Sequence, residues 1–142
     1  MRSASLYVFV ENCLEVIEFY RNIFNGEIKN IQQNDEGKCL HAELSFGSSC
    51  IYFSDTFGQV QKGDNVRISL ECESEEEIRR VYQSLVVDGR INFEIQPTSW
   101  GALHANVVDQ FGVGWLLNFT TSMTVLLRFI ESTVFPLFKE VI

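Results

Sequence analysis

The chain contains two histidines, His41 and His104, and each stands in a similar short segment. Residues 40–44 read Leu-His-Ala-Glu-Leu, and residues 103–107 read Leu-His-Ala-Asn-Val at an offset of 63 positions. An imidazole can bind or release a proton near neutral pH, so the pair could act as hydrogen-bonding groups or as a general base. The alternative is structural, with each ring bonded only to a neighbouring strand. Both histidines are candidate catalytic residues.

Further residues of the strand-like segments could bind a ligand. Arg67 lies in a segment of alternating apolar and polar residues, and an enclosed arginine requires an anion or a carboxylate as partner. Glu43 or Glu71 could supply that partner within the protein. Aromatic residues could form a wall for a flat ligand or could simply pack, and Trp115 is expected to anchor a turn. The ligand-binding candidates are Arg67, Tyr7, Phe9, Glu43, Tyr52, Ser54, Ser69, Trp100 and Asn106.

A similar succession of elements surrounds each histidine. Apolar residues recur at helical spacing over 14–24 and again over 78–86, and each stripe is followed by an Asn-Gly or Asp-Gly pair that predicts the helix end. Ser74 and Glu77 have the spacing of a capping box, which predicts the start of the second helix.

Strand-like segments complete two modules of the order βαβββ. They are expected at about 6–10, 27–33, 38–46 and 49–55, and again at about 66–72, 91–96, 102–109 and 113–119. The modules therefore span about 5–57 and 65–119, with Gln61–Asp64 as linker. The fold class is α+β.

The expected strands alternate between apolar and polar residues, as strands with two different surroundings do. In the third strand, the residues expected on the core face are Leu40, Ala42, Leu44 and Phe46. His41 and Glu43 point to the other face. In the fifth strand, the core face takes Val66, Ile68 and Leu70. We expect each apolar face to pack on its helix and the polar faces to line a cleft enclosed by the two modules.

These segments resemble the PhnB-like branch of the vicinal-oxygen-chelate superfamily, which includes glyoxalase I, extradiol dioxygenases and bleomycin-resistance proteins. The motifs are CLEVIEFYRNIFNGE (13–27), LHAELSFGSS (40–49), Ser54-Asp55 and WGALHANVVDQFGVGWLLNF (100–119). The resemblance covers about residues 5–119 and implies a cup-shaped, eight-stranded half-barrel that is commonly a homodimer. Some relatives carry the name 3-demethylubiquinone 3-methyltransferase. This chain lacks a glycine-rich loop after the first strand that could hold S-adenosylmethionine.

Metal-dependent members of the superfamily take their ligands from the first and last strands of each module. Those strands offer Tyr7, Phe9, Tyr52, Ser54, Arg67, Ser69, Leu117 and Asn118. None of these pairs a histidine with a carboxylate, whereas a divalent ion requires three or four nitrogen or oxygen ligands. We therefore expect no catalytic metal and no other cofactor.

Composition narrows the class of partner and the location. The net charge of −8 argues against nucleic acid and against an anionic membrane surface, which both attract basic proteins. The four cysteines form no CxxC pair, which is typical of reduced thiols, and the chain shows neither a signal peptide nor a spanning segment. We expect a cytoplasmic protein with a small-molecule ligand.

The last part of the chain lies beyond the resemblance. Residues 122–142 carry apolar residues at near-helical spacing, and Pro136 is expected to interrupt that helix. We expect one domain over 1–121 followed by this helical extension, which would share in a homodimer interface because its apolar stripe needs cover.

Three functions fit these observations. The first is a metal-independent protein that binds a small aromatic or carboxylate-bearing molecule in the cup. The second is a metal-dependent lyase, isomerase or dioxygenase on the same fold. The third is a homo-oligomeric interaction protein whose cup is filled by its own side chains.

Overall fold

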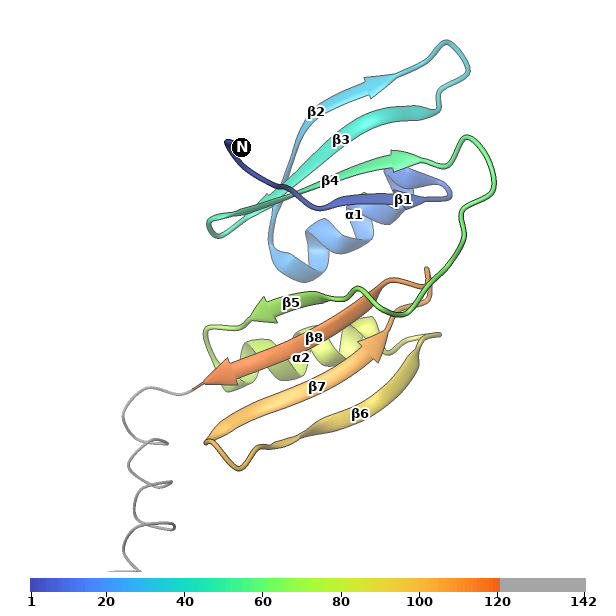
Figure 1. Cartoon of the computed structure of the whole chain (residues 1–142). Helices are drawn as coiled ribbons and strands as arrows, with labels where there is room; N and C mark the ends of the chain where they lie inside the picture. Colours follow the sequence, from blue (N-terminus) through green and yellow to red (C-terminus); the bar gives the residue numbers. More distant parts are fainter. Residues whose placement is uncertain (121–142) are drawn as a thin grey trace, which may run out of the picture. The chain divides into compact units, whose positions relative to one another are not determined.

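The protein consists of two compact units divided between Lys62 and Gly63, and the computed structural model describes residues 1–120. Within residues 1–120, each unit contains a four-stranded sheet and one helix. Figure 1 shows the helix of each unit beside its own sheet. The order of elements is βαβββ in both units. The predicted α+β class and the internal repeat are therefore confirmed.

The first unit places its helix against one face of its sheet. Its elements are β1 (Tyr7–Val10), α1 (Cys13–Phe24), β2 (Glu27–Gln33), β3 (Cys39–Phe46) and β4 (Ser49–Asp55). The sheet order is β1-β4-β3-β2, with β1 parallel to β4. Tyr20 of α1 is fully buried, with its ring centroid 5.7 Å from that of Phe53 on β4. The apolar stripe of the helix thus forms the core with the inward residues of the sheet.

The second unit repeats this arrangement. Its elements are β5 (Ile68–Glu71), α2 (Glu75–Leu85), β6 (Arg90–Pro97), β7 (Ala102–Val108) and β8 (Gly114–Thr120). The sheet order is β5-β8-β7-β6, with β5 parallel to β8. The helix α2 packs on β7 and β8 and buries Ile78, Val81 and Leu85, every one of them in the predicted stripe.

The helix boundaries follow the predicted signals. Ser74 Oγ accepts a hydrogen bond from the backbone N–H of Glu77 at 3.0 Å, and Glu77 Oε1 accepts one from the backbone N–H of Glu73 at 3.1 Å. Both bonds satisfy donors near the start of α2. Helix α1 ends at Asn25, which adopts the left-handed conformation with φ 52°.

Two residues expected in the core are exposed. Leu40 is 46% exposed. The neighbouring residues Gln32 and Gln33 of β2 pair with His41 and Cys39 of β3, so Leu40 is an extra residue of β3 between two paired positions. Such a bulge changes which residues face inward, and Cys39 takes the buried position. Val66 is exposed because β5 begins only at Ile68. The predictions that Leu40 and Val66 belong to the core are therefore wrong.

Neither α1 nor α2, the helices found in residues 1–120, has the length and apolar character that crossing a membrane requires. The helical extension predicted for 122–142 lies outside the described residues. The cup-shaped arrangement of the two modules stays a prediction.

Candidate functional site

The first unit carries a row of predicted ligand residues on the sheet face opposite α1. Tyr7 of β1 is paired with Tyr52 of β4, and Tyr52 is paired with Glu43 of β3. In the next row, Phe9 is paired with Ser54. Strand alternation places all of these side chains on one face, as the sequence predicts.

Four rings of this face contact one another, and we call Tyr7, Phe9, His41 and Tyr52 the aromatic face. The ring centroid of Tyr7 lies 5.0 Å from Phe9, 5.9 Å from His41 and 6.3 Å from Tyr52. His41 and Tyr52 are 5.4 Å apart. Tyr7 is 39% exposed and Phe9 is 54% exposed, so the rings form an accessible surface.

Glu43 lies beside the aromatic face and is held by two side chains. Its Oε1 is 3.1 Å from His41 Nε2, and its Oε2 accepts a hydrogen bond from Asn30 Nδ2 at 2.7 Å. The bond from His41, followed by that from Asn30, lowers the pKa of Glu43. Since an ionised carboxylate only accepts, His41 donates to it from Nε2.

Asn30 is a residue of this group that the sequence reasoning missed. It has φ 53° at an irregularity of β2 between Lys29 and Gln32. An asparagine inside a strand-like segment is itself a signal of such a bulge, because asparagine is depleted in strands and tolerates the left-handed conformation.

Ser54 belongs to the same face but is buried. Its Oγ donates a hydrogen bond to the backbone oxygen of Asp55 at 3.1 Å. The Ser54 hydroxyl is therefore less accessible to a ligand than the rings of Tyr7 and Phe9.

In the second unit, His104 joins a chain of polar side chains. His104 Nδ1 lies 2.8 Å from Asn118 Oδ1, and Asn118 Nδ2 donates to Ser69 Oγ at 3.2 Å. Because the amide oxygen is an acceptor, His104 donates to it from Nδ1. Of these three, His104 and Ser69 were predicted ligand or catalytic candidates.

Arg67 is engaged within the second unit. Its Nη1 donates to Asn106 Oδ1 at 2.6 Å and to the backbone oxygen of Val107 at 3.4 Å, and its Nη2 bonds Asp64. The side chain is only 13% exposed. Its internal partners are thus Asp64 and Asn106 instead of Glu43 or Glu71. Arg67 and Asn106 were separate ligand candidates, and the structure brings them together with the guanidinium already bonded.

The two tryptophans have different surroundings. Trp100 is exposed in the segment between β6 and β7. Trp115 is fully buried, and its Nε1 donates to Asp109 Oδ2 at 2.8 Å across the β7–β8 turn. The expectation that Trp115 anchors this turn is confirmed.

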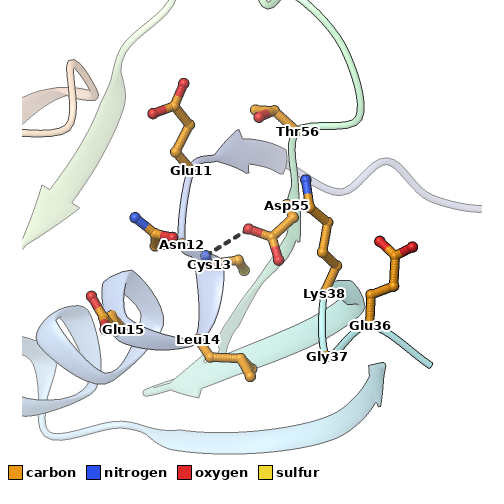
Figure 2. A pocket seen from close by; sticks show the side chains of 10 residues that line it. All are labelled: Glu11, Asn12, Cys13, Leu14, Glu15, Glu36, Gly37, Lys38, Asp55 and Thr56. Atoms are coloured by element: carbon orange, nitrogen blue, oxygen red, sulfur yellow. Dashed lines mark hydrogen bonds between the residues drawn. The ribbon is translucent and has the colours of Figure 1, made fainter. Parts of the chain in front are cut away.

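A cavity of about 440 Å³ opens at the start of α1 in the first unit. Figure 2 shows that the carboxylate of Asp55 points toward the helix start, and Lys38 also lines the cavity. Asp55 Oδ1 accepts from the backbone N–H of Cys13 at 3.0 Å, and Oδ2 accepts from that of Cys39 at 2.7 Å. None of the predicted ligand or catalytic residues lines this cavity.

The described residues 1–120 offer neither a clustered set of metal ligands nor a glycine loop after β1 for a methyl-donor cofactor. Within residues 1–120, no three His, Cys, Asp or Glu side chains gather as a metal-binding group. The connection from β1 to α1 is Glu11-Asn12 and contains no glycine to approach a bound cofactor closely. The expectation of a metal-free protein stays a prediction.

The chain is similar in sequence to a known protein and in fold to several solved structures. Escherichia coli (strain K12) protein YjdN is 24% identical over 131 residues, which cover 78% of this chain and 89% of YjdN. The structure of the PhnB protein from Bacillus cereus has a TM-score of 0.76 at 23% identity, covering 84% of this chain and 100% of that one. A glyoxalase/bleomycin resistance protein/dioxygenase family enzyme from Burkholderia phytofirmans PsJN has a TM-score of 0.62 at 14% identity, covering 82% and 97%.

The family assignment rests on sequence and fold together. Residues 2–118 match the profile of the family described as 3-demethylubiquinone-9 3-methyltransferase. The matched residues contain both βαβββ units almost entirely. The chain therefore belongs to this PhnB-like family, and its fold is that of the glyoxalase/bleomycin resistance/dioxygenase superfamily.

Proposed function

We propose that the protein binds a small organic molecule on the strand faces opposite its helices and that it does so without a catalytic metal. The observation that carries this proposal is the aromatic face. Its rings contact one another but stay accessible, whereas Tyr20 and Phe53 of the same unit are buried in the core. Accessible apolar surface with a few fixed polar groups is typical of ligand sites.

The polar groups near these rings support the same proposal. A hydrogen bond holds Glu43 and His41 in place in the first unit. In the second unit, hydrogen bonds join Ser69, Asn118 and His104 in a chain. Side chains that are fixed before a ligand arrives lose little conformational entropy on binding. We further propose that the ligand-binding form is a cytoplasmic homodimer.

An NMR titration of the full-length, isotope-labelled protein against a library of small aromatic compounds tests the function. We expect hits whose chemical-shift changes cluster at Tyr7, His41 and Tyr52. Tyr52→Leu should weaken those hits, because it removes one ring of the aromatic face. The sheet should tolerate leucine there, because Leu116 lies opposite Asn106 at the corresponding position of the second unit. A folded protein that shows no shift on either strand face with any compound would contradict the proposal.

The metal-free part of the proposal has its own test. The strand positions that supply ligands in metal-dependent relatives carry mainly aromatic, hydroxyl and amide side chains. We expect elemental analysis of untagged, gently purified protein to show well under one equivalent of zinc, nickel, iron or manganese. A stoichiometric ion that only chelators remove would instead support the metal-dependent enzyme.

A further inference from the structure

We propose that the aromatic face selects an organic cation, meaning a positively charged nitrogen attached to a flat or apolar body. This inference rests on the proposed small-molecule function and names the class of ligand. Of the two expected ligand types, aromatic or carboxylate-bearing, it keeps the aromatic body and gives it a positive charge.

The rings provide the first attraction. The faces of tyrosine and phenylalanine carry negative electrostatic potential and attract a cation within about 6 Å of the ring centre. Centroid separations of 5.0 Å for Tyr7–Phe9 and 6.3 Å for Tyr7–Tyr52 let one charged group approach more than one ring. The protein already makes one such contact elsewhere, where Lys38 Nζ lies 5.5 Å from the ring centroid of Phe57.

Glu43 provides the second attraction. Its backbone is paired with that of Tyr52, and its side chain is 21% exposed, so the carboxylate borders the rings in a partly desolvated position. His41 and Asn30 each use one of its oxygens, and a carboxylate has about four acceptor sites in all. The carboxylate therefore keeps free acceptor capacity for a charged N–H donor.

The nearest lysine across the sheet is engaged with another partner. Lys29 is paired with Glu43 along the strands, but its Nζ lies 3.6 Å from Glu27 Oε2. The Lys29–Glu27 pair is largely exposed, so salt and solvent screen it. After the hydrogen bond from His41, the charge of Lys29 still helps to lower the pKa of Glu43, so the carboxylate that borders the rings is favoured in its ionised form.

The second unit shows that the sheet itself does not require these residues. Tyr7, Tyr52 and Glu43 form one row across the first sheet. The corresponding row of the second sheet is Ser69, Leu116 and Asn106, which contains neither a ring nor a charge. The second unit thus forms the same kind of sheet without two tyrosines and a glutamate in this row.

The guanidinium that could favour an anion is already bonded. Arg67 donates to Asn106, and its Nη2 faces the carboxylate of Asp64. An anionic ligand would have to replace Asp64 there, whereas a cation meets the open rings of the first unit. The observations therefore favour positive charge on the ligand.

Three probes of similar shape test the inference at pH 7 and low salt, namely benzylammonium, benzyl alcohol and benzoate. NMR titration of the full-length protein should show benzylammonium binding at Tyr7, His41 and Tyr52 with about tenfold higher affinity than the other two. Glu43→Gln should lower the benzylammonium affinity about tenfold and leave that of benzyl alcohol unchanged. The matched control Glu36→Gln removes the same charge from an exposed turn of the same unit and should change neither affinity by more than about twofold.

Tyr52→Leu gives an independent check, because Glu43 also has a structural role with His41 and Asn30. It should weaken benzylammonium binding while the melting temperature confirms folding. Equal or tighter binding of benzoate at these residues overturns the cation inference but leaves the small-molecule function in place. If none of the probes perturbs the aromatic face and the wider library fails as well, both proposals are overturned.

Discussion

Asp55 connects two distant parts of the first unit through a single carboxylate. Its two oxygens accept hydrogen bonds from the backbone N–H groups of Cys13 at the start of α1 and Cys39 at the start of β3. Asn12 at the helix start makes no side-chain cap of its own. The carboxylate therefore does the work that a capping side chain does in other helices, and negative charge is favourable at that helix end.

We expect Asp55→Ala to lower the free energy of unfolding by about 2–4 kcal/mol, because it leaves two buried donors without an acceptor. Urea denaturation followed by circular dichroism measures this loss. Asp35→Ala, at an exposed turn position, is the control and should change stability by no more than about 0.5 kcal/mol. Equal effects of the two substitutions would show that Asp55 has no special role.

Cys72 should react with alkylating agents only at high pH. Burial, followed by the nearby charges of Glu77 and Glu71, raises its pKa from 9.0 to about 11. Because the thiolate is the reactive form, labelling by iodoacetamide should rise steeply only toward pH 11 in the native protein. Mass spectrometry of Cys72 peptides measures the rate, and the urea-unfolded protein is the control with an ordinary pH dependence.

The same pKa shift affects stability with a definite sign. The native state holds the Cys72 proton more tightly than the unfolded state, so this contribution to stability is fully present below pH 9.0. It is lost as the pH rises toward about 11. A native labelling rate that follows the unfolded control between these values would contradict both statements.

At the scale of the elements, the two helices start in different ways although their modules repeat. Helix α1 depends on Asp55 from a distant strand, whereas α2 begins with the local cap of Ser74 and Glu77. Acidic residues Glu75, Glu76 and Glu77 fill the first turn of α2, where negative charge is favourable. Only the start of α2 can be predicted from residues that are neighbours in the sequence.

Ser74→Ala should therefore destabilise the protein by about 1 kcal/mol, the usual cost of losing an N-cap hydroxyl. Thermal and urea unfolding measure the change. Ser84→Ala is the matched control within the same helix, because Ser84 Oγ only donates to the Arg80 carbonyl on an exposed surface. A Ser74→Ala loss no larger than that of Ser84→Ala would mean that the cap does not stabilise α2.

At the scale of the whole molecule, the extension after the second unit is expected to contribute to self-association. The near-helical apolar spacing of 122–142 predicts a stripe that water disfavours, so a second copy of the chain is the proposed cover. Glu131 and Glu140 offset Arg128 and Lys139, which leaves no basic face for anionic lipid.

A chain ending at Thr121 should therefore lose dimer mass or thermal stability relative to the full-length protein. Size-exclusion chromatography with light scattering gives the mass, and calorimetry gives the melting temperature. Lys139→Gln in the full-length chain, on the polar side of the expected helix, is the control and should change neither. Unchanged mass and unchanged melting temperature after truncation would show that the extension supports neither the dimer nor the core.

The sequence by itself determined the repeated βαβββ order, the helix stripes and the cap at Ser74. These features depend on local periodicity and on residues a few positions apart, which the chain displays directly. It also placed Tyr7, Tyr52 and Glu43 on one face, because strand alternation follows from backbone geometry.

Only the tertiary structure decided the exposed position of Leu40 and the partners of Arg67, Glu43 and Asp55. A single extra residue in β3 exposes Leu40, and its position depends on how β2 and β3 pair. Arg67 meets Asn106 across 39 positions of sequence, and Asp55 meets Cys13 across 42. Such contacts arise when separate strands and helices come together in space, so no local pattern specifies them.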